Sequence, residues 1–597
     1  MSYRIDPSDN SIIFEGHENG IADNPYNGIA DMRNVNIISV PGEASVGFST
    51  TAITYSSPGS GNVTSADAPT DVITYSSLPS IEAGMAVTFS VTTIAGISTG
   101  VVYWLGNTSS TQSKLYSDYT LNTVVNLTSG GTGTFSVVTI SGYPKYFTQD
   151  SNGSYYTIDS TGRVWSNVFT TTNGFWRYLG NTTLTNASGN GIVAYSASDG
   201  TVYVFIFRNS LIDYLKSPAG STPSWVYGWN PTTAGSGSVG TMLKTSAGTN
   251  NNHEAIVGPD NKVYFVDANW IGRFYQIDPA TAFDPTNTAT YVYDQTSLLP
   301  FTDIANCLAP LGTNLLVGGS KNVVYPWDTF SPLPSYPLMI AEINIKKMIT
   351  VNTNTFIFAG NRGRIYITNG SQAQLYKKIP DHISGTVEPY FTWGGATSNK
   401  NQLYFSASVT TNAGSAISQY GGVWAIDLDT QAIRLVNKLS YATYAGYATA
   451  LIPNTFASAA GTGIYIGWDS GSSTYGIDTT SSSPYTGSQA VIVYDLVPIG
   501  TFDNPSEFER VEYKLTKPMV SGESISIYAR LIFNTTDTGF GTAMLTDSTV
   551  GNFSSSAPVN FKNAQWLQLQ AVLNSTASSP SYTRLKEIRI KRVTKNE

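Results

Sequence analysis

The sequence of 597 residues predicts an all-β fold: a β-propeller of six or seven blades, an inserted small β-barrel or sandwich domain, and a C-terminal β-sandwich. One hairpin pattern recurs, in which an alternating apolar run, a Gly/Asn/Asp turn and a second run with Tyr or Trp follow one another, as at 155–165. β-Branched and aromatic residues dominate between the turns, and no convincing amphipathic segment exceeds two or three helical turns. Because one hairpin cannot bury its apolar face alone, repeated hairpins indicate stacked or radial packing.

The first two parts of the chain differ sharply in composition. Residues 1–50 form a lead-in segment with a turn cluster at 24–28 and a strand at 31–37. Residues 51–140 are almost devoid of basic residues, are rich in Thr, Ser and Gly, and carry short strand-like runs about ten residues apart. That spacing suits a small antiparallel barrel or sandwich, so we expect an inserted domain here.

The remaining chain predicts the propeller at 141–498 and the sandwich at 499–597. Blades usually take about 40–50 residues, and a segment of about 350 residues exceeds the usual size of a sandwich. In 499–597, polar or charged residues alternate with apolar ones, which implies one buried and one solvated face of a sheet. The propeller segment holds seven hairpin units, whose inner strands we expect near Tyr156, Tyr195, Ile256, Leu316, Ile357, Tyr404 and Tyr465.

The charge of the chain limits its partners. Net charge is −8, the pI is about 5.1, and charged residues make up 12%, about half the usual share of ~25%. This argues against general nucleic-acid binding through a basic field, although an acidic channel could let DNA slide past. The only basic cluster in the sequence is C-terminal, and we interpret it as a solvated strand face or subunit contact, with a phosphate site as the alternative: Lys586, Arg589, Lys591, Arg592 and Lys595.

The cysteine content and the absence of targeting patterns indicate where the protein assembles. The single cysteine, Cys307, lies in an apolar stretch and is interpreted as a small buried hydrophobe, so no intrachain disulfide is expected. The N-terminus has no signal-peptide pattern, and no run approaches the ~20 apolar residues of a membrane span. We therefore expect assembly in a reducing cytoplasm and no membrane-spanning segment.

The sequence predicts no enzyme and no metal or cofactor site. His17, His253 and His382 lie far apart, and no nucleophile elbow, phosphate-binding loop or dinucleotide motif is present. The only serious enzymatic alternative is a propeller glycosidase, which needs just two carboxylates. Most of the candidates directly follow a strand, where Asp usually caps a turn: Asp267, Asp278, Asp328, Asp427, Asp469 and Asp478.

Aromatic residues make up 12% of the chain, and most are expected to fill blade cores and cross-strand pairs. Trp225, Trp229 and Trp270 are the candidates for a different role, because tryptophans in loops can stack on sugars. Otherwise, these three side chains would pack between blades or between subunits.

Three segments resemble tail proteins of tailed bacteriophages. The lead-in reads NPYNGIADMRNVNI and then PGEA at 24–44, similar to the opening of those proteins before their propeller. The segment 315–328 reads LLVGGSKNVVYPWD and looks like a blade motif of the same group, and 87–135 resembles a small β module inserted in many phage virion proteins. The family named by this resemblance is that of tail hub or nozzle proteins, also called DNA-stabilisation proteins. The insertion at 51–140 is not part of that family's core pattern.

The resemblance implies a propeller-containing subunit that forms a ring, hexameric in the family, below the portal and adaptor. We expect a virion structural protein of the phage tail: a nozzle or hub subunit that extends and closes the DNA ejection conduit and supports fibres. Its partners would be copies of itself, adaptor and fibre proteins, and DNA passing without sequence-specific binding. The alternatives are a tail adhesin that binds a host glycan receptor and, less favoured, a propeller glycosidase.

Overall fold

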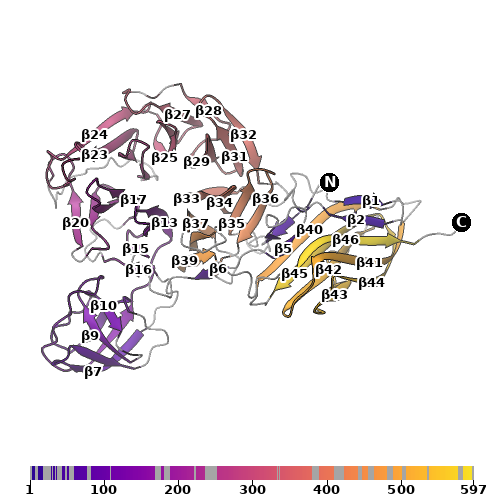
Figure 1. Ribbon diagram of the computed structural model, residues 1–597, viewed down its shortest axis with the longest axis horizontal. Helices are drawn as coiled ribbons and strands as arrows, with labels where there is room; N and C mark the ends of the chain where they lie inside the picture. Colours follow the sequence, from indigo (N-terminus) through magenta and orange to yellow (C-terminus); the bar gives the residue numbers. More distant parts are fainter. Residues whose placement is uncertain are drawn as a thin grey trace.

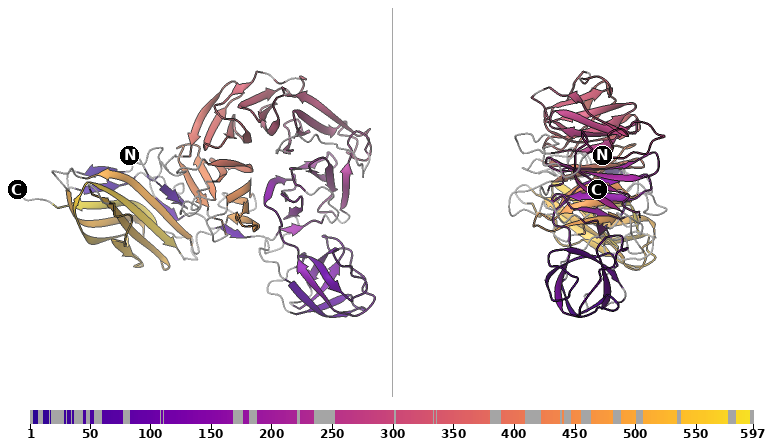
Figure 2. Two further views of the ribbon diagram at one scale, coloured as in Figure 1. Left: turned by 180° about the vertical axis from the view of Figure 1, so that it is seen from behind. Right: turned by 90° about the vertical axis from the view of Figure 1, so that its left-hand side faces the viewer.

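The computed structural model describes 3–6, 11–15, 17, 29, 31–33, 35–36, 44–46, 50–52, 60–76, 83–107, 109, 111–167, 176–180, 188–220, 223–234, 252–300, 302–332, 334, 336–379, 389–408, 422–437, 439–440, 447–454, 463–480, 488–499, 506–533, 537–575 and 583–593. These residues form strands β1 to β46 and no α-helix. None of their segments is therefore a helix with the length and apolar character needed to cross a bilayer. A ring of sheets carries a barrel and a sandwich on its rim (Figures 1 and 2).

Seven four-stranded antiparallel sheets surround one axis and form a seven-bladed β-propeller, which confirms the predicted propeller fold (Figure 1). Blade 1 contains β13 (Pro144–Gln149), β14 (Tyr155–Asp159), β15 (Val164–Ser166) and β16 (Arg177–Tyr178). Blade 2 contains β17 (Gly191–Ser196), β18 (Val202–Phe207), β19 (Ile212–Lys216) and β20 (Ser224–Trp229). Blade 3 contains β21 (Ala255–Val257), β22 (Val263–Asp267), β23 (Trp270–Gln276) and β24 (Tyr291–Leu298). Blade 4 contains β25 (Ala305–Leu311), β26 (Asn314–Gly319), β27 (Val323–Trp327) and β28 (Leu338–Met339). Blade 5 contains β29 (Ile345–Val351), β30 (Asn354–Ala359), β31 (Arg364–Thr368) and β32 (Ala373–Lys378).

The last two blades connect the propeller to the rest of the chain. Blade 6 contains β33 (Tyr390–Asn399), β34 (Gln402–Ser408), β35 (Val423–Asp427) and β36 (Ile433–Asn437). Blade 7 contains β37 (Tyr447–Pro453), β38 (Ile464–Asp469) and β39 (Tyr475–Thr480). Its fourth strand, β6 (Thr50–Ala52), comes from the N-terminal segment and pairs antiparallel with β39. The ring is thus closed by main-chain hydrogen bonds between the two ends of the propeller sequence.

The first strand of each blade lies innermost, because these strands contact one another in succession around the ring, from β13 to β37 and back to β13. Seven residues were expected near the innermost strands, and we call them the marker residues. Two of them, Tyr195 in β17 and Ile256 in β21, lie in an innermost strand. The other five markers lie on the second strand of their blade: Tyr156, Leu316, Ile357, Tyr404 and Tyr465. The prediction of innermost strands was wrong there because the second strand is buried on both faces, which gives it the most continuous apolar run.

Between β6 and β13 the chain forms a closed six-stranded barrel in the order β10-β11-β8-β7-β12-β9. Its strands are β7 (Ser60–Asp67), β8 (Val72–Tyr75), β9 (Ala86–Thr92), β10 (Val102–Asn107), β11 (Gln112–Tyr116) and β12 (Gly133–Val137). Strand β10 alternates strictly: Tyr103 and Leu105 point into the barrel core, whereas Val102 and Trp104 belong to the core shared with the propeller.

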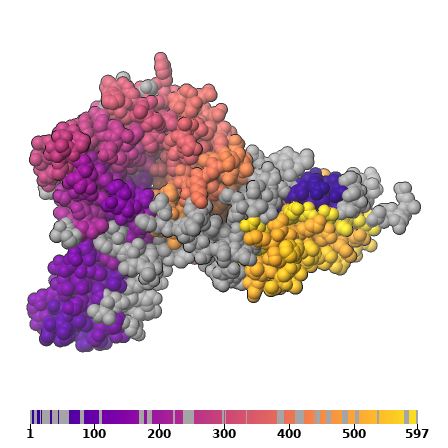
Figure 3. Space-filling view, in the orientation of Figure 1, coloured from indigo at the N-terminus to yellow at the C-terminus, as the bar shows by residue number. Residues whose placement is uncertain are grey.

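Trp104 fastens the barrel to the outer edge of blade 1. Its indole Nε1 donates to the carbonyl oxygen of Tyr178 at 2.9 Å, and the two rings stack with centroids 6.5 Å apart. Nearby, the Arg177 guanidinium of β16 donates to the carbonyl oxygen of Tyr119 at 2.8 Å, and the Tyr119 hydroxyl donates to the carbonyl of Pro218. These bonds join the barrel to blades 1 and 2, and the barrel projects from that side of the ring (Figure 3).

We expect Trp104→Ala to release the barrel without unfolding it. The substitution removes a buried tryptophan, which typically costs about 3–5 kcal/mol, but the residues of the barrel's own core are untouched. Small-angle scattering should show a larger radius of gyration, and limited proteolysis should cut faster between barrel and propeller. The control is Val91→Ala, at an exposed barrel position. An unchanged radius in Trp104→Ala would contradict the docking role.

The C-terminal region and the first strands form a two-sheet sandwich. One sheet contains β1 (Tyr3–Asp6), β2 (Ser11–Phe14), β46 (Arg584–Arg592), β41 (Ser506–Lys517) and β44 (Ser554–Ala564). The other begins with β43 (Leu545–Asp547), β42 (Glu523–Ile532), β45 (Trp566–Ser575) and β40 (Ser488–Pro498). Strand β40, at the end of the predicted propeller range, therefore belongs to the sandwich. The short β4 (Val35–Asn36) and β5 (Ser45–Val46) pair with each other.

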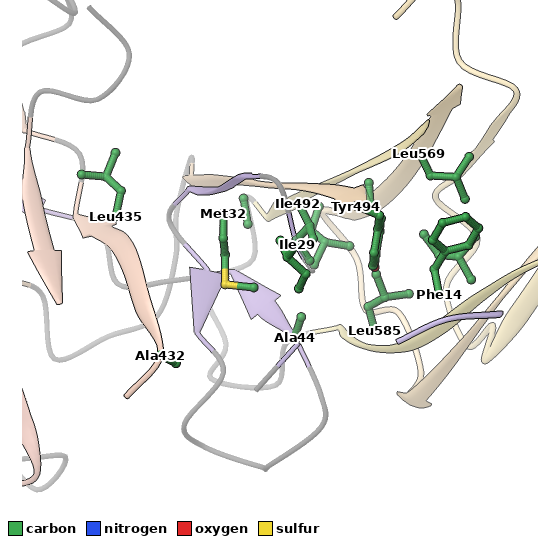
Figure 4. Packing of buried hydrophobic residues seen from close by; sticks show 14 of the residues in the cluster. Phe14, Ile29, Met32, Ala44, Ala432, Leu435, Ile492, Tyr494, Leu569 and Leu585 are labelled. Carbon is green, nitrogen blue, oxygen red and sulfur yellow. The ribbon is translucent and has the colours of Figure 1, made fainter. Parts of the chain in front are cut away.

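Strand β3 (Asp31–Arg33) joins the sandwich to the propeller. It pairs antiparallel with β40 and parallel with β36, so that one sheet of 13 strands runs from the sandwich through blade 6 to blade 7. Met32 is fully buried in a hydrophobic cluster whose members include Phe356 of blade 5 and Ile590 of the sandwich. Figure 4 shows Met32 between Leu435 of blade 6 and Ile492 of the sandwich. The lead-in segment thus supplies strands to both bodies, which share one hydrophobic core.

Candidate functional site

The three tryptophans proposed for sugar stacking lie in outer strands of the blades and not in loops. Trp229 is fully buried, and its Nε1 donates to the carbonyl oxygen of Pro285 in blade 3 at 2.8 Å. Trp225, on the same strand, is half-buried, and its Nε1 donates to the carbonyl of Leu179 in blade 1 at 3.2 Å. Trp270 begins β23 and is half-buried. The first two side chains therefore connect neighbouring blades, which was the other expectation for them.

Four of the six candidate aspartates cap turns with their carboxylates. Asp278, Asp328, Asp427 and Asp469 each accept a hydrogen bond from a main-chain N–H two residues later, at 2.7–3.1 Å. Such a bond closes the tight turn that follows a strand. No hydrogen bond or ion pair brings two of the six into one site, and across the described ranges no group of three His, Cys, Asp or Glu could hold a metal ion.

The other two aspartates are buried inside blades 3 and 7. Asp267 accepts from the Gln295 amide at 3.0 Å. Asp478 accepts from the Ser440 N–H at 2.7 Å, the Ser440 hydroxyl at 2.6 Å and the Trp468 indole at 2.8 Å. Burial raises the pKa of Asp478 to about 6, against the lowering effect of these hydrogen bonds.

This raised pKa predicts a pH dependence of stability. The unfolded carboxyl ionises near 3.8, whereas the folded one keeps its proton to about 6, so the contribution of Asp478 to stability declines as pH rises across this window. A shift of about 2 units corresponds to about 3 kcal/mol. The free energy of unfolding of Asp478→Asn, relative to that of the wild type, should therefore increase by about this amount between pH 4 and pH 7, as measured by calorimetric melting. Every other carboxyl is common to both proteins, so a constant difference would contradict the assignment.

The described histidines lie in separate parts of the structure, and the described C-terminal basic residues lie on β46. His17 contacts the Tyr494 hydroxyl at 2.8 Å in the sandwich, His253 is buried in blade 3, and His382 lies outside the described residues. On β46, Arg589 forms ion pairs with Glu512 and Glu587, and Lys586 is exposed. Lys591 and Arg592 lie on the same strand, and Lys595 lies outside the described residues.

The strongest concentration of polar chemistry lies at the propeller axis. We call it the axial cluster, and its members lie on, or directly before, the innermost strands of blades 1 to 5: Lys145, Tyr146, Asn190, Asn252, His253, Glu254, Asn306, Cys307, Lys346 and Lys347. They gather because the first strand of every blade faces the axis. Blade 6 adds Trp393.

Hydrogen bonds link the axial cluster from blade to blade. The Lys145 ammonium donates to Asn190 Oδ1 at 2.9 Å, and the His253 N–H donates to the Asn190 carbonyl at 2.9 Å. The Tyr146 hydroxyl of blade 1 donates to Asn252 Oδ1 ahead of blade 3, passing blade 2. The Asn306 amide in turn donates to the carbonyl of Ile345 at 3.1 Å. Because Tyr146 is buried while reaching past a blade, side chains occupy the axis at this level.

The charges of the axial cluster are unevenly compensated. Glu254 is buried and forms an ion pair with Lys347, although burial still raises the pKa of this carboxyl above its usual value. Burial and the nearby Lys346 ammonium lower the pKa of Lys145 to about 8, and burial lowers that of Lys346 to about 8. Burial also raises the pKa of Cys307, so its thiol stays protonated and unreactive.

Sequence reasoning missed this cluster and placed the only basic cluster at the C-terminus. The axial residues come from five blades and share no local motif. One signal was available: Lys346-Lys347 is a basic pair inside a strand of a chain in which only 12% of residues are charged. Consecutive side chains of a strand point to opposite faces, and here Lys347 pairs with Glu254 while Lys346 lies against Trp393 of blade 6.

Comparisons with known proteins find solved structures of limited similarity and no family. No protein-family model matches the sequence, and no curated protein matches it. The structure is similar to YCF48 bound to D1 peptide, with 9% identity, a TM-score of 0.36, and coverage of 58% of this chain and 94% of that one. It is also similar to the Cps50 (Swd1) β-propeller domain of Myceliophteria thermophila, with 10% identity, a TM-score of 0.37, and coverage of 57% and 98%.

A third similar structure is the computationally designed Ika8 protein, with 11% identity, a TM-score of 0.34, and coverage of 68% of this chain and 98% of that one. At these identities and scores, similarity carries no argument about function. The propeller assignment stands on the seven sheets described above.

Proposed function

We propose that the protein is a structural subunit of a bacteriophage tail, a nozzle or hub component that forms a ring with copies of itself. In this role it extends and closes the DNA ejection conduit and supports fibres. The observation that carries the proposal is the fusion of propeller and sandwich through β3 into one sheet and one core. A wall under pressure needs such rigid continuity, and the resemblance of 24–44 and 315–328 to tail proteins supplies the biological setting.

The position of the conduit follows from the axial cluster. Because Tyr146 and its partners occupy the propeller axis, DNA would pass between copies of the chain and not through a single propeller. The net charge of −8 fits such a lumen, since acidic walls repel phosphates and prevent adhesion.

Contacts between copies need exposed apolar groups, and blade 4 provides them. Phe330 and Tyr336, in the segment between β27 and β28, are 81% and 90% exposed. Large aromatic side chains are enriched at protein interfaces and carry much of their binding energy. We expect Phe330→Ser with Tyr336→Ser to weaken self-association, measured by mass photometry, whereas Val550→Ser, at an exposed sandwich position, should not.

The decisive experiment is electron cryomicroscopy of the phage particle and light scattering of the purified chain. The proposal expects closed rings in solution or in the particle, with this chain located in the tail below the portal. Monomers in solution together with no copy of the chain in the tail would overturn it.

One observation favours a second candidate, glycan binding by a tail adhesin. Trp225 and Tyr227 are both half-buried and stack within 2° of parallel, with centroids 5.7 Å apart, which forms a flat aromatic platform on blade 2. Sugars stack on such platforms. Binding on a glycan array that is lost in Trp225→Ala, measured at a temperature at which circular dichroism shows the variant to be folded, would favour this role, and the absence of any glycan signal in wild type would exclude it.

A further inference from the structure

We propose that the axial cluster binds a small dianionic oxyanion, of the phosphate or sulfate type, between the ammonium groups of Lys145 and Lys346. This site is independent of the proposed tail function, because it depends only on the arrangement of blades 1, 5 and 6.

The two ammonium groups lack carboxylate partners. Lys145 Nζ donates to the neutral Oδ1 of Asn190 at 2.9 Å, and Lys346 Nζ lies 4.0 Å from the ring centroid of Trp393. Among the described residues neither lysine forms an ion pair, whereas their neighbour Lys347 has Glu254. Two positive charges are therefore left uncompensated in one place.

The two lysines lie close together although they come from blades 1 and 5. Strand β33 of blade 6 contacts β13, which carries Lys145, and its Trp393 lies against Lys346, so β33 brings the two lysines to one side of the ring; in keeping with this, the Lys346 ammonium disfavours protonation of Lys145. The backbone supports this approach: a side chain at Gly394 would collide with the carbonyl oxygen of Lys145, and Gly394 directly follows the Trp393 that faces Lys346. Glycine at 394 thus permits β33 to pass against β13 beside the lysine pair.

The surrounding groups do not cancel this charge. His253 is held neutral because burial lowers its pKa, Tyr146 and Cys307 stay protonated because burial raises theirs, and Glu254 is matched by Lys347. The local excess of two positive charges matches a dianion.

Donors are also available. An ammonium group carries three N–H donors, of which Lys145 uses one on Asn190. Both lysines are half-buried, so part of each side chain remains in contact with solvent. Charge-assisted hydrogen bonds to an oxyanion are stronger than neutral ones, and partial burial reduces their screening.

The test is calorimetric titration of the full-length protein with sodium sulfate at constant ionic strength, with sodium chloride as the reference ion. We expect one sulfate site per chain near pH 7, at least about tenfold weaker in Lys346→Met and lost in Lys145→Met/Lys346→Met. Methionine preserves the length of the side chain without its charge. The matched control is Lys377→Met, on the outer strand β32 of the same blade as Lys346, which should bind as wild type does.

A second measurement needs no variant. Because the lysines titrate near pH 8, sulfate binding at pH 8.5 should be accompanied by proton uptake, seen as a dependence of the heat on buffer ionisation enthalpy. At pH 6.5 this uptake should vanish, because both groups are already protonated. Equal binding of sulfate and chloride, or sulfate binding that survives the double substitution, would overturn the proposal while leaving the tail function untouched.

Discussion

Replacing Trp229 with alanine is expected to lower the free energy of unfolding by about 3–5 kcal/mol. The indole is fully buried between blades 2 and 3, packs on Phe205, Phe274 and Tyr291, and donates to the carbonyl of Pro285. Its loss leaves a cavity that rigid strands cannot fill and a carbonyl without its donor. Differential scanning calorimetry should show a large drop in melting temperature.

Trp225→Ala is the matched control for Trp229→Ala. It removes the same side chain four residues earlier on the same strand, but from a half-buried position, so the loss of stability should be clearly smaller. Equal effects of the two substitutions, or an unchanged melting temperature in Trp229→Ala, would show that blade 2 does not depend on this contact.

Replacing Lys347 with methionine is expected to destabilise the protein by about 3–5 kcal/mol, because it leaves the buried carboxylate of Glu254 without its cation. The cost should be smaller at low pH, where Glu254 takes up a proton: burial already raises its pKa, and removing Lys347 raises it further. Thermal melts from pH 4 to pH 8 measure this difference.

The double variant Glu254→Gln/Lys347→Met separates the burial of charge from the loss of packing. It removes both the carboxylate at 254 and the ammonium group at 347, so we expect it to regain much of the stability lost in Lys347→Met. A double variant as unstable as the sum of its single variants would show that packing, and not charge, dominates at this position.

The alternating patterns predicted most of the fold. Turn residues and apolar alternation identified the hairpins, the inserted barrel and the sandwich, because these features depend on residues close together in the sequence. The same reasoning expected a strand at 31–37, where β3 and β4 lie, but it could not find β6 or the distant partners of these short strands, such as Val491 for β3 and Asp478 for β6. The sequence of such a short strand does not by itself show which distant strand it pairs with.

The candidate site was less predictable for a related reason. Trp225 and Trp229 were expected in loops, but strand periodicity places them in β20, and only the neighbouring blades decide which one is buried. Lys145 and Lys346 lie on blades 1 and 5, with three blades between them in the sequence, and they influence each other only because the ring closes. Electrostatic pairing across a closed ring has no local signature.

The exchange of strands between the two ends of the chain also governs the order in which the molecule forms during translation. Strand β1 begins the sheet completed by β46, and β6 waits for β39, so neither can settle until the C-terminal region has left the ribosome. The barrel, whose strands β7 to β12 pair among themselves, can fold while synthesis continues. A nascent chain would thus carry one finished module while its first strands stay open to chaperones, and the ring could close only after β39 has left the ribosome.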